Sequence, residues 1–187
     1  MRSSGTTRNP RRDRSFPLWV DIRGDDHPKA CTGRRLLARG IVRRSPHPPP
    51  GPPIVLDPYA PIVFSAQDRL YAERHGFLVV DCSWNRLSER GSLGGTTVPP
   101  AHHRRLPLLL ATNPQHFGRV GQLNTAEAFA AALAVSGQEA AARKLLDAFH
   151  GSAAFFHVNE SRFRRYRGAK TPHEMLAAER AEFSPVG

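Results

Sequence analysis

The chain contains few of the features that mark secreted or membrane proteins. Only two cysteines, Cys31 and Cys82, occur among its 187 residues, too few for the disulfide framework of a small secreted domain. No apolar run reaches the roughly 20 residues that cross a bilayer, and no apolar segment near the N-terminus has the form of a secretory signal. We therefore expect a cytoplasmic protein with no membrane partner.

Several common enzyme signatures are absent as well. There is no GxGxxG motif, no P-loop and no serine, histidine and aspartate arrangement that argues for a hydrolase. His27, Cys31 and Cys82 form no CxxC or HxxxH pair, so we expect no metal site.

Acidic residues are scarce relative to basic ones. Asp and Glu number 16 against 27 Lys and Arg, which gives a formal net charge of +11 and a pI of about 11.1. Such a balance favours a polyanionic partner, most simply nucleic acid. A basic surface without such a partner is the alternative.

Short strands and helices alternate in the first part of the chain. Apolar runs predict strands at 18–22, 54–56, 62–64, 77–80 and 106–111, with helices over 34–39 and from Ser65 to His75. The run at 77–80 is apolar throughout, as in a strand buried on both faces. This alternation predicts an α/β fold with a mostly parallel sheet of about five strands.

The second part of the chain is predicted to be helical. Asn124, followed by Glu127, indicates a helix start, a second helix covers 139–149, and the C-terminal stretch is charged and rich in alanine. We divide the chain into a disordered basic tail (1–15), an α/β domain (16–111) and an α-helical domain (112–187). A proline-rich linker at 45–53 lies within the α/β domain.

The segment Val79-Val80-Asp81-Cys82-Ser83-Trp84 carries the clearest chemical signal. Asp81 stands where a buried strand ends, which is where open α/β sheets bind ligands, and Trp84 is placed to stack on a purine. Asp81 is equally well placed to cap the helix that follows.

Three further segments are candidate binding elements. A glycine-containing loop (29–33) follows the first strand, and a strand, loop and capped helix follow at 106–114 and 121–128; either arrangement also occurs in proteins where it only turns the chain. Near the C-terminus, basic residues alternate with Phe163 and Tyr166, a pattern that suits phosphate contact and base stacking as well as a solvated helix. The predicted RNA-binding residues there are Arg162, Arg164, Arg165, Arg167 and Lys170.

Together these segments resemble the small-subunit (16S and 18S) rRNA aminocarboxypropyltransferase family of ribosome biogenesis. That family carries a PKxCxG loop, a VVDCSW strand end, an LPxLxAANP strand and a KLxxxEA helix. Here they stand in the same order as PKACTG (28–33), VVDCSW (79–84), LPLLLATNP (106–114) and QLNTAEA (122–128). The resemblance covers about residues 18–159.

The resemblance implies a SPOUT-like fold, in which a helical domain follows the parallel sheet and the chain forms a trefoil knot. It implies transfer of the 3-amino-3-carboxypropyl group of S-adenosylmethionine (SAM) to N3 of a uridine derivative, typically N1-methylpseudouridine, in small-subunit rRNA. Methylthioadenosine is released and no metal is required. We expect the protein to act as a monomer.

The resemblance also assigns residues. Asp81 is expected to face the reacting carbon, either as a base or to hold the substrates in place, and Thr32 to lie near the amino-acid end of SAM. Leu56 and Trp84 are expected to sandwich the adenine. The remaining contacts to SAM are expected from Val80, Leu106, Gly121 and Thr125.

Two departures from the family pattern stand out. Gly121 replaces an aromatic residue, so its contact is through the backbone only, and His27 stands where the family often has a cysteine. Two other functions compete with the transferase: a SPOUT-type RNA methyltransferase that uses the same co-substrate, and a non-catalytic rRNA-binding assembly factor.

Overall fold

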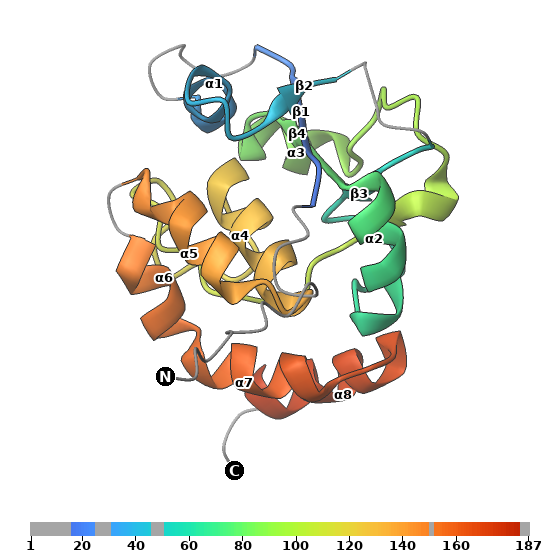
Figure 1. Cartoon of the computed structure of the whole chain (residues 1–187), viewed down its shortest axis with the longest axis vertical. Coiled ribbons are helices and arrows are strands. Elements are labelled where there is room, and N and C mark those ends of the chain that lie inside the picture. Colours follow the sequence, from blue (N-terminus) through green and yellow to red (C-terminus); the bar gives the residue numbers. More distant parts are fainter. Residues whose placement is uncertain (1–15, 25–30, 46–50, 150–151, 184–187) are drawn as a thin grey trace, which may run out of the picture.

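The computed structural model describes residues 16–24, 31–45, 51–149 and 152–183 (Figure 1). The predicted tail, His27 and most of the proline-rich linker lie outside these residues. The strands are β1 (Leu18–Ile22), β2 (Arg43–Arg44), β3 (Ile54–Leu56), β4 (Phe77–Asp81) and β5 (His103–Arg104). The α-helices are α1 (Thr32–Ala38), α2 (Arg69–His75), α3 (Trp84–Arg90), α4 (Thr125–Val135), α5 (Glu139–Asp147), α6 (Ser152–Val158), α7 (Glu160–Gly168) and α8 (Pro172–Phe183), with short 3₁₀ turns at Ala66–Asp68 and Pro100–His102.

The five strands form one parallel sheet in the order β2-β1-β4-β3-β5. β1 and β4 pair over their full length, from Leu18 opposite Phe77 to Ile22 opposite Asp81. Every residue of β4 is buried, as its apolar run predicts. The predicted α/β class with a parallel five-stranded sheet is confirmed. Because all strands run the same way, the carboxyl ends of β1, β3 and β4 share one edge of the sheet.

Two of the predicted strands are wrong. The segment 62–64 makes only an isolated bridge, from Val63 to Arg105, and in the run 106–111 only Leu110 makes one, to Val120. The sheet is completed instead by β2 and β5, two-residue strands that the apolar pattern does not indicate.

The physical reason lies in the backbone partners of these segments. Ile62 and Phe64 pair their backbone groups with the single residue Arg105, which is too short a ladder for a strand. In the second run, side chains take the place of a neighbouring strand. The Leu108 N–H donates to Glu179 at 2.8 Å, and the Leu110 N–H and C=O bond to the Asn159 amide at 2.8 and 2.9 Å. The run is apolar because it is largely buried, not because it belongs to the sheet.

Helix α4 is the centre of the helical half. The predicted start is confirmed: the Asn124 side chain accepts from the Glu127 N–H, and the Glu127 carboxylate accepts from the Asn124 N–H. All of its residues are buried, and its alanines let α1, α5, α7 and β4 approach closely. One cluster of buried residues joins the sheet, through Val20 and Phe77, to the helices, through Phe129 and Tyr166.

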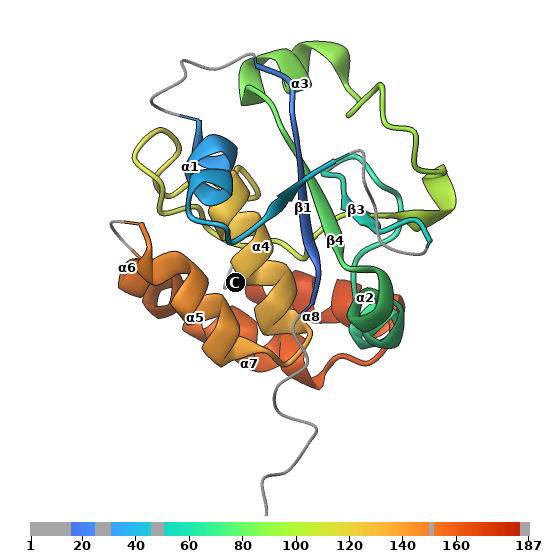
Figure 2. The same ribbon diagram turned by 45° about the horizontal axis from the view of Figure 1, so that its top comes forward.

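The helices surround the sheet unevenly. Figure 1 shows α1 and α3 near the top of the molecule and α7 and α8 near the bottom, with α4 and α5 between them, and Figure 2 again shows α3 at the top and α7 near the bottom. None of the described helices is long and apolar enough to span a membrane.

Candidate functional site

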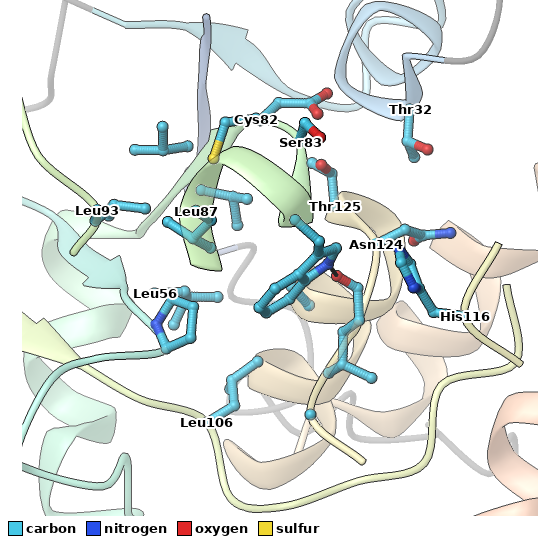
Figure 3. A pocket seen from close by; sticks show the side chains of 18 of the residues that line it. Thr32, Leu56, Cys82, Ser83, Leu87, Leu93, Leu106, His116, Asn124 and Thr125 are labelled. Carbon is cyan, nitrogen blue, oxygen red and sulfur yellow. Dashed lines mark hydrogen bonds between the residues drawn. The ribbon is translucent and has the colours of Figure 1, made fainter. Parts of the chain in front are cut away.

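A pocket of about 420 Å³ opens at the carboxyl edge of the sheet. Its walls come from the start of α1, the ends of β3 and β4, the start of α3, the segment 105–108 and the turn that leads into α4. In Figure 3, Thr32, Asn124 and Thr125 lie toward the upper right of the cavity, with Leu56, Leu87 and Leu106 toward the left and bottom. One end of the pocket is therefore polar and the other apolar.

The eight residues predicted for SAM binding and catalysis all line this pocket. They come from five separate segments that the fold brings together: Thr32, Leu56, Val80, Asp81, Trp84, Leu106, Gly121 and Thr125.

Asp81 ends β4 with its side chain only 8% exposed. Its Oδ2 accepts a hydrogen bond from the Gly33 N–H at 2.5 Å and one from the Cys31 thiol at 3.3 Å. A side chain at position 33 would not fit, because its Cβ would lie 2.2 Å from the same oxygen. The start of α1 thus fixes the carboxylate, and residue 33 has to be glycine for that contact.

The thiol of Cys31 supports the same carboxylate. Burial raises the pKa of Cys31 above its usual value, and the nearby charge of Asp81 raises it further. The sulfur therefore keeps its proton and serves as a donor. Its position as the N-cap residue of α1, where it accepts from the Arg34 N–H, fixes it at the pocket wall.

Ser83 stands at the N-cap position of α3, but its side chain makes no capping hydrogen bond, so the alternative role of Asp81 as a cap for this helix stays open. Trp84 is the first residue of that helix, and its indole Nε1–H donates to the Leu123 carbonyl at 3.0 Å. This bond ties α3 to the segment before α4 and fixes the indole ring in the pocket wall.

Glu127 is a residue whose larger role the sequence did not reveal. It is 3% exposed, and its carboxylate accepts hydrogen bonds from the Thr112 N–H and hydroxyl, the Asn113 amide and the Asn124 N–H, at 2.7 to 3.0 Å. It therefore fastens the loop after residue 111 to the start of α4. The helix-start pattern found Glu127, but only the fold brings Thr112 and Asn113 to it.

The comparisons with known proteins agree on one family. The protein-family model described as "Ribosome biogenesis protein, C-terminal" matches residues 54–183 of this chain. The 16S rRNA aminocarboxypropyltransferase of Methanopyrus kandleri is 36% identical over 165 residues, which cover 87% of this chain and 95% of that protein. The 18S rRNA aminocarboxypropyltransferase of Schizosaccharomyces pombe is 37% identical over 147 residues, which cover 78% of this chain and 49% of that protein.

The structure of the SAM-dependent rRNA acp-transferase of Vulcanisaeta distributa superposes with a TM-score of 0.74 at 26% identity, covering 89% of this chain and 97% of that one. This chain belongs to the rRNA aminocarboxypropyltransferase family. The resemblance inferred from the four motifs is confirmed.

The residues predicted to bind RNA lie on α7 and just after it, apart from the pocket, and most of them have partners within the protein. Arg164 pairs with Glu160 at 3.7 Å, Arg165 with Glu182, and Arg167 with Glu139 at 2.9 Å. Arg162 donates to the Val158 carbonyl and lies over the Phe183 ring. At Lys170 the bond to Glu174 comes from the backbone N–H, not from the side chain. The RNA-binding role of this surface stays a prediction.

No metal cluster was expected, and within the described ranges no group of three or more His, Cys, Asp or Glu side chains is placed to hold an ion. His27, which was weighed as a ligand, is outside those ranges. The reaction expected for this family needs no metal, because a sulfonium is already a good leaving group.

Proposed function

We propose that this protein transfers the 3-amino-3-carboxypropyl group of SAM to N3 of a uridine derivative, N1-methylpseudouridine in the family's reaction, in small-subunit rRNA. The N3 lone pair forms a bond to the carbon next to sulfur. The carbon–sulfur bond breaks with its electrons on sulfur, and the sulfonium becomes the neutral thioether of methylthioadenosine. The N3 proton passes to Asp81 or to water.

One observation carries the proposal: the residues that the family resemblance assigns to SAM come from five separate segments and line a single pocket, in a chain whose relatives are named for this activity. A pocket of about 420 Å³ lies within the range of small-molecule sites.

The apolar end of the pocket suits the adenine of SAM, and the polar end suits its amino-acid group. The indole of Trp84 and the side chains of Leu56 and Leu106 offer apolar faces for the adenine. At the polar end, α4 begins with Thr125, and the positive end of the helix dipole there favours a carboxylate. Thr32 adds a hydroxyl there. Val80, Leu106 and Gly121 contribute backbone groups.

We assign Asp81 the position beside the reacting carbon. Its carboxylate is held by Gly33 and Cys31, so it is positioned before any substrate arrives. A fixed carboxylate at that place stabilises the cationic sulfonium end of SAM or accepts the N3 proton. RNA contact by Arg162, Arg164, Arg165, Arg167 and Lys170 is the prediction taken from the sequence. The glutamate partners of Arg164, Arg165 and Arg167 lower the contribution expected from these three residues.

The products of the reaction test the proposal. The protein is incubated with SAM and small-subunit rRNA, and the nucleoside released from SAM is separated by chromatography. We expect methylthioadenosine. Release of S-adenosylhomocysteine would identify a methyltransferase, and RNA binding without either product would identify an assembly factor.

The finer points of the fold belong to the same proposal. The likeness to the Vulcanisaeta distributa structure supports a SPOUT-like arrangement with a trefoil knot, which an experimental structure tests by tracing the chain through the loop at 106–123. The division after residue 111, the monomeric state and the cytoplasmic location stay predictions. Limited proteolysis, light scattering and microscopy of the tagged protein test them in turn.

A further inference from the structure

The turn at 113–121 carries a large aromatic side chain into solvent. Phe117 is 68% exposed, although most large apolar side chains in the described residues are buried. Its neighbours in sequence belong to the pocket: Gln115, His116 and Gly121 line it, and Figure 3 shows the His116 ring at its right-hand side. Phe117 therefore lies on a turn whose neighbouring residues form part of the pocket wall.

This turn is held in one conformation by its own hydrogen bonds. Ala111 and Arg119 are joined by a backbone bond of 2.9 Å, Gly118 donates to Ala111 at 2.8 Å, and Gly121 donates to Leu109 at 2.8 Å. Gly118 has a φ of +76°, which a residue with a side chain adopts only with strain.

The base of the turn is fixed as well. The His116 N–H donates to the Asn113 side chain at 3.0 Å, and Asn113 is bound to the buried Glu127 at 2.7 Å. Phe117 thus lies on a turn that hydrogen bonds hold in place. No other aromatic ring in the described part of the chain stacks on it.

The charge around Phe117 favours an anionic partner. Arg119, two residues on, is exposed and has no ion pair with any described residue. The exposed apolar surface is small, formed by Phe117 with the 44% exposed Val120. Protein interfaces bury far more surface, whereas an exposed ring and an exposed guanidinium on one turn match a stacked base and its phosphate.

We propose that Phe117 is a stacking platform for an unpaired base of the RNA substrate, next to the nucleotide that enters the pocket, and that Arg119 contacts the adjoining phosphate. This inference rests on the proposed function for the identity of the RNA. Stacking beside the pocket holds the target nucleotide in reach of Asp81 and is open only to single-stranded RNA.

The test measures RNA and SAM binding on the same variants of the full chain. The RNA probe is a single-stranded oligonucleotide containing a uridine flanked by purines. Phe117→Ala is expected to weaken its binding about tenfold, to leave SAM affinity within twofold, and to raise the KM for rRNA while kcat stays near the wild-type value. Phe117→Trp is expected to retain binding.

Leu70→Ala is the matched control, because Leu70 is 78% exposed on α2 and does not line the pocket. It is expected to leave RNA binding unchanged. The dependence of RNA affinity on salt concentration separates the stacking contact from the phosphate contact. Phe117→Ala keeps the wild-type slope of log affinity against log salt, since stacking releases no counterions, and Arg119→Gln lowers that slope.

Three results would overturn the platform: equal RNA affinity in Phe117→Ala and the wild type, equal losses in Phe117→Ala and Leu70→Ala, or a large loss of melting temperature in Phe117→Ala, which would mean that the ring is packed inside. Failure of the proposed function is separate. It shows as absence of methylthioadenosine from the wild-type protein, whatever Phe117→Ala does to RNA binding.

Discussion

Charged side chains have different kinds of partner on the pocket side of the molecule and on the α7–α8 side. Around α7 and α8, charged side chains face one another. Glu179, 5% exposed, binds Arg105 through both oxygens at 2.7 and 2.8 Å, and Glu182 binds Arg165 and Ser161. At the pocket, Asp81 has backbone and thiol donors, and its carboxylate lines a cavity.

The arginines show the same contrast. Three arginines of α7, Arg164, Arg165 and Arg167, face glutamates. Within the described residues, three exposed arginines of α1 and β2 have no acidic partner: Arg34, Arg43 and Arg44. Arg43 lies over the Trp19 ring instead. α1 starts at Thr32 in the pocket wall, so Arg34, two residues further along this helix, lies near the pocket. The comparison teaches that one side stabilises the fold and the other is open to ligands.

Asp81→Asn tests the pocket side and has the largest expected effect. Asparagine keeps an oxygen that accepts from Gly33 but carries no charge and takes no proton. We expect transfer to slow by roughly 10²–10⁴, with SAM affinity within a few-fold and little change in melting temperature. Single-turnover transfer, calorimetry and thermal unfolding on the same sample measure all three. Equal losses of rate and SAM affinity would make Asp81 a ligand for SAM only.

Glu179→Ala tests the α7–α8 side of the molecule. It leaves Arg105 and the Leu108 N–H without their partner, in a place where Glu179 is 5% exposed. We expect a loss of roughly 3 kcal/mol of stability, or about 6–12 °C in melting temperature for a chain of this size. Because Arg105 and Leu108 also line the pocket, the protein that remains folded is expected to bind SAM somewhat more weakly than the wild type. A loss of SAM affinity without a loss of stability would contradict the division of roles.

Trp84→Ala sharpens the account of the pocket. It removes the aromatic face and the hydrogen bond to Leu123. Aromatic stacking of this kind contributes roughly 1–3 kcal/mol, so we expect SAM affinity to fall about 5- to 150-fold. Calorimetry measures it, with Trp84→Phe as a control that keeps a ring. Unchanged affinity in a folded Trp84→Ala protein rules out the adenine platform.

The arginines of α1 and β2 and those of α7 can be compared by the salt dependence of RNA binding. This comparison has the smallest expected effect. Replacing Arg34, Arg43 and Arg44 by Gln is expected to lower the slope of log affinity for RNA against log salt by about 2, since each phosphate contact to a single strand contributes about 0.7. Replacing Arg164, Arg165 and Arg167 is expected to lower it by less than about 1, because a phosphate has to displace a glutamate there. The reverse order would place RNA on α7.

Much of the fold could be predicted from local patterns in the sequence. The buried run at 77–80 and the Asn124–Glu127 helix start depend on neighbouring residues alone, and both are found as predicted. The pocket residues were assigned through the motifs of the family, and the structure brings all eight of them to one cavity; their roles stay predictions.

What could not be predicted depends on partners far away in sequence. The run 106–111 resembles a strand, yet its backbone bonds to Asn159 and Glu179, which lie 49 and 71 residues beyond the groups they bind. Gly33 could be read only as a turn residue, because Asp81, the reason for it, lies 48 residues further on. The basic pattern of α7 gave no sign of glutamates on α5 and α8. Periodicity reports burial and local turns, and it does not report which distant group is the partner.

The central claim is that the pocket breaks the bond between sulfur and the carboxypropyl carbon of SAM rather than the bond to its methyl group. Two preparations of SAM, one labelled in the carboxyl carbon and one in the methyl group, are each incubated with the protein and small-subunit rRNA, and the RNA is then counted. The account predicts that the carboxyl label enters the RNA and the methyl label does not. Methyl label in the RNA, with the carboxyl label left in solution, would contradict it.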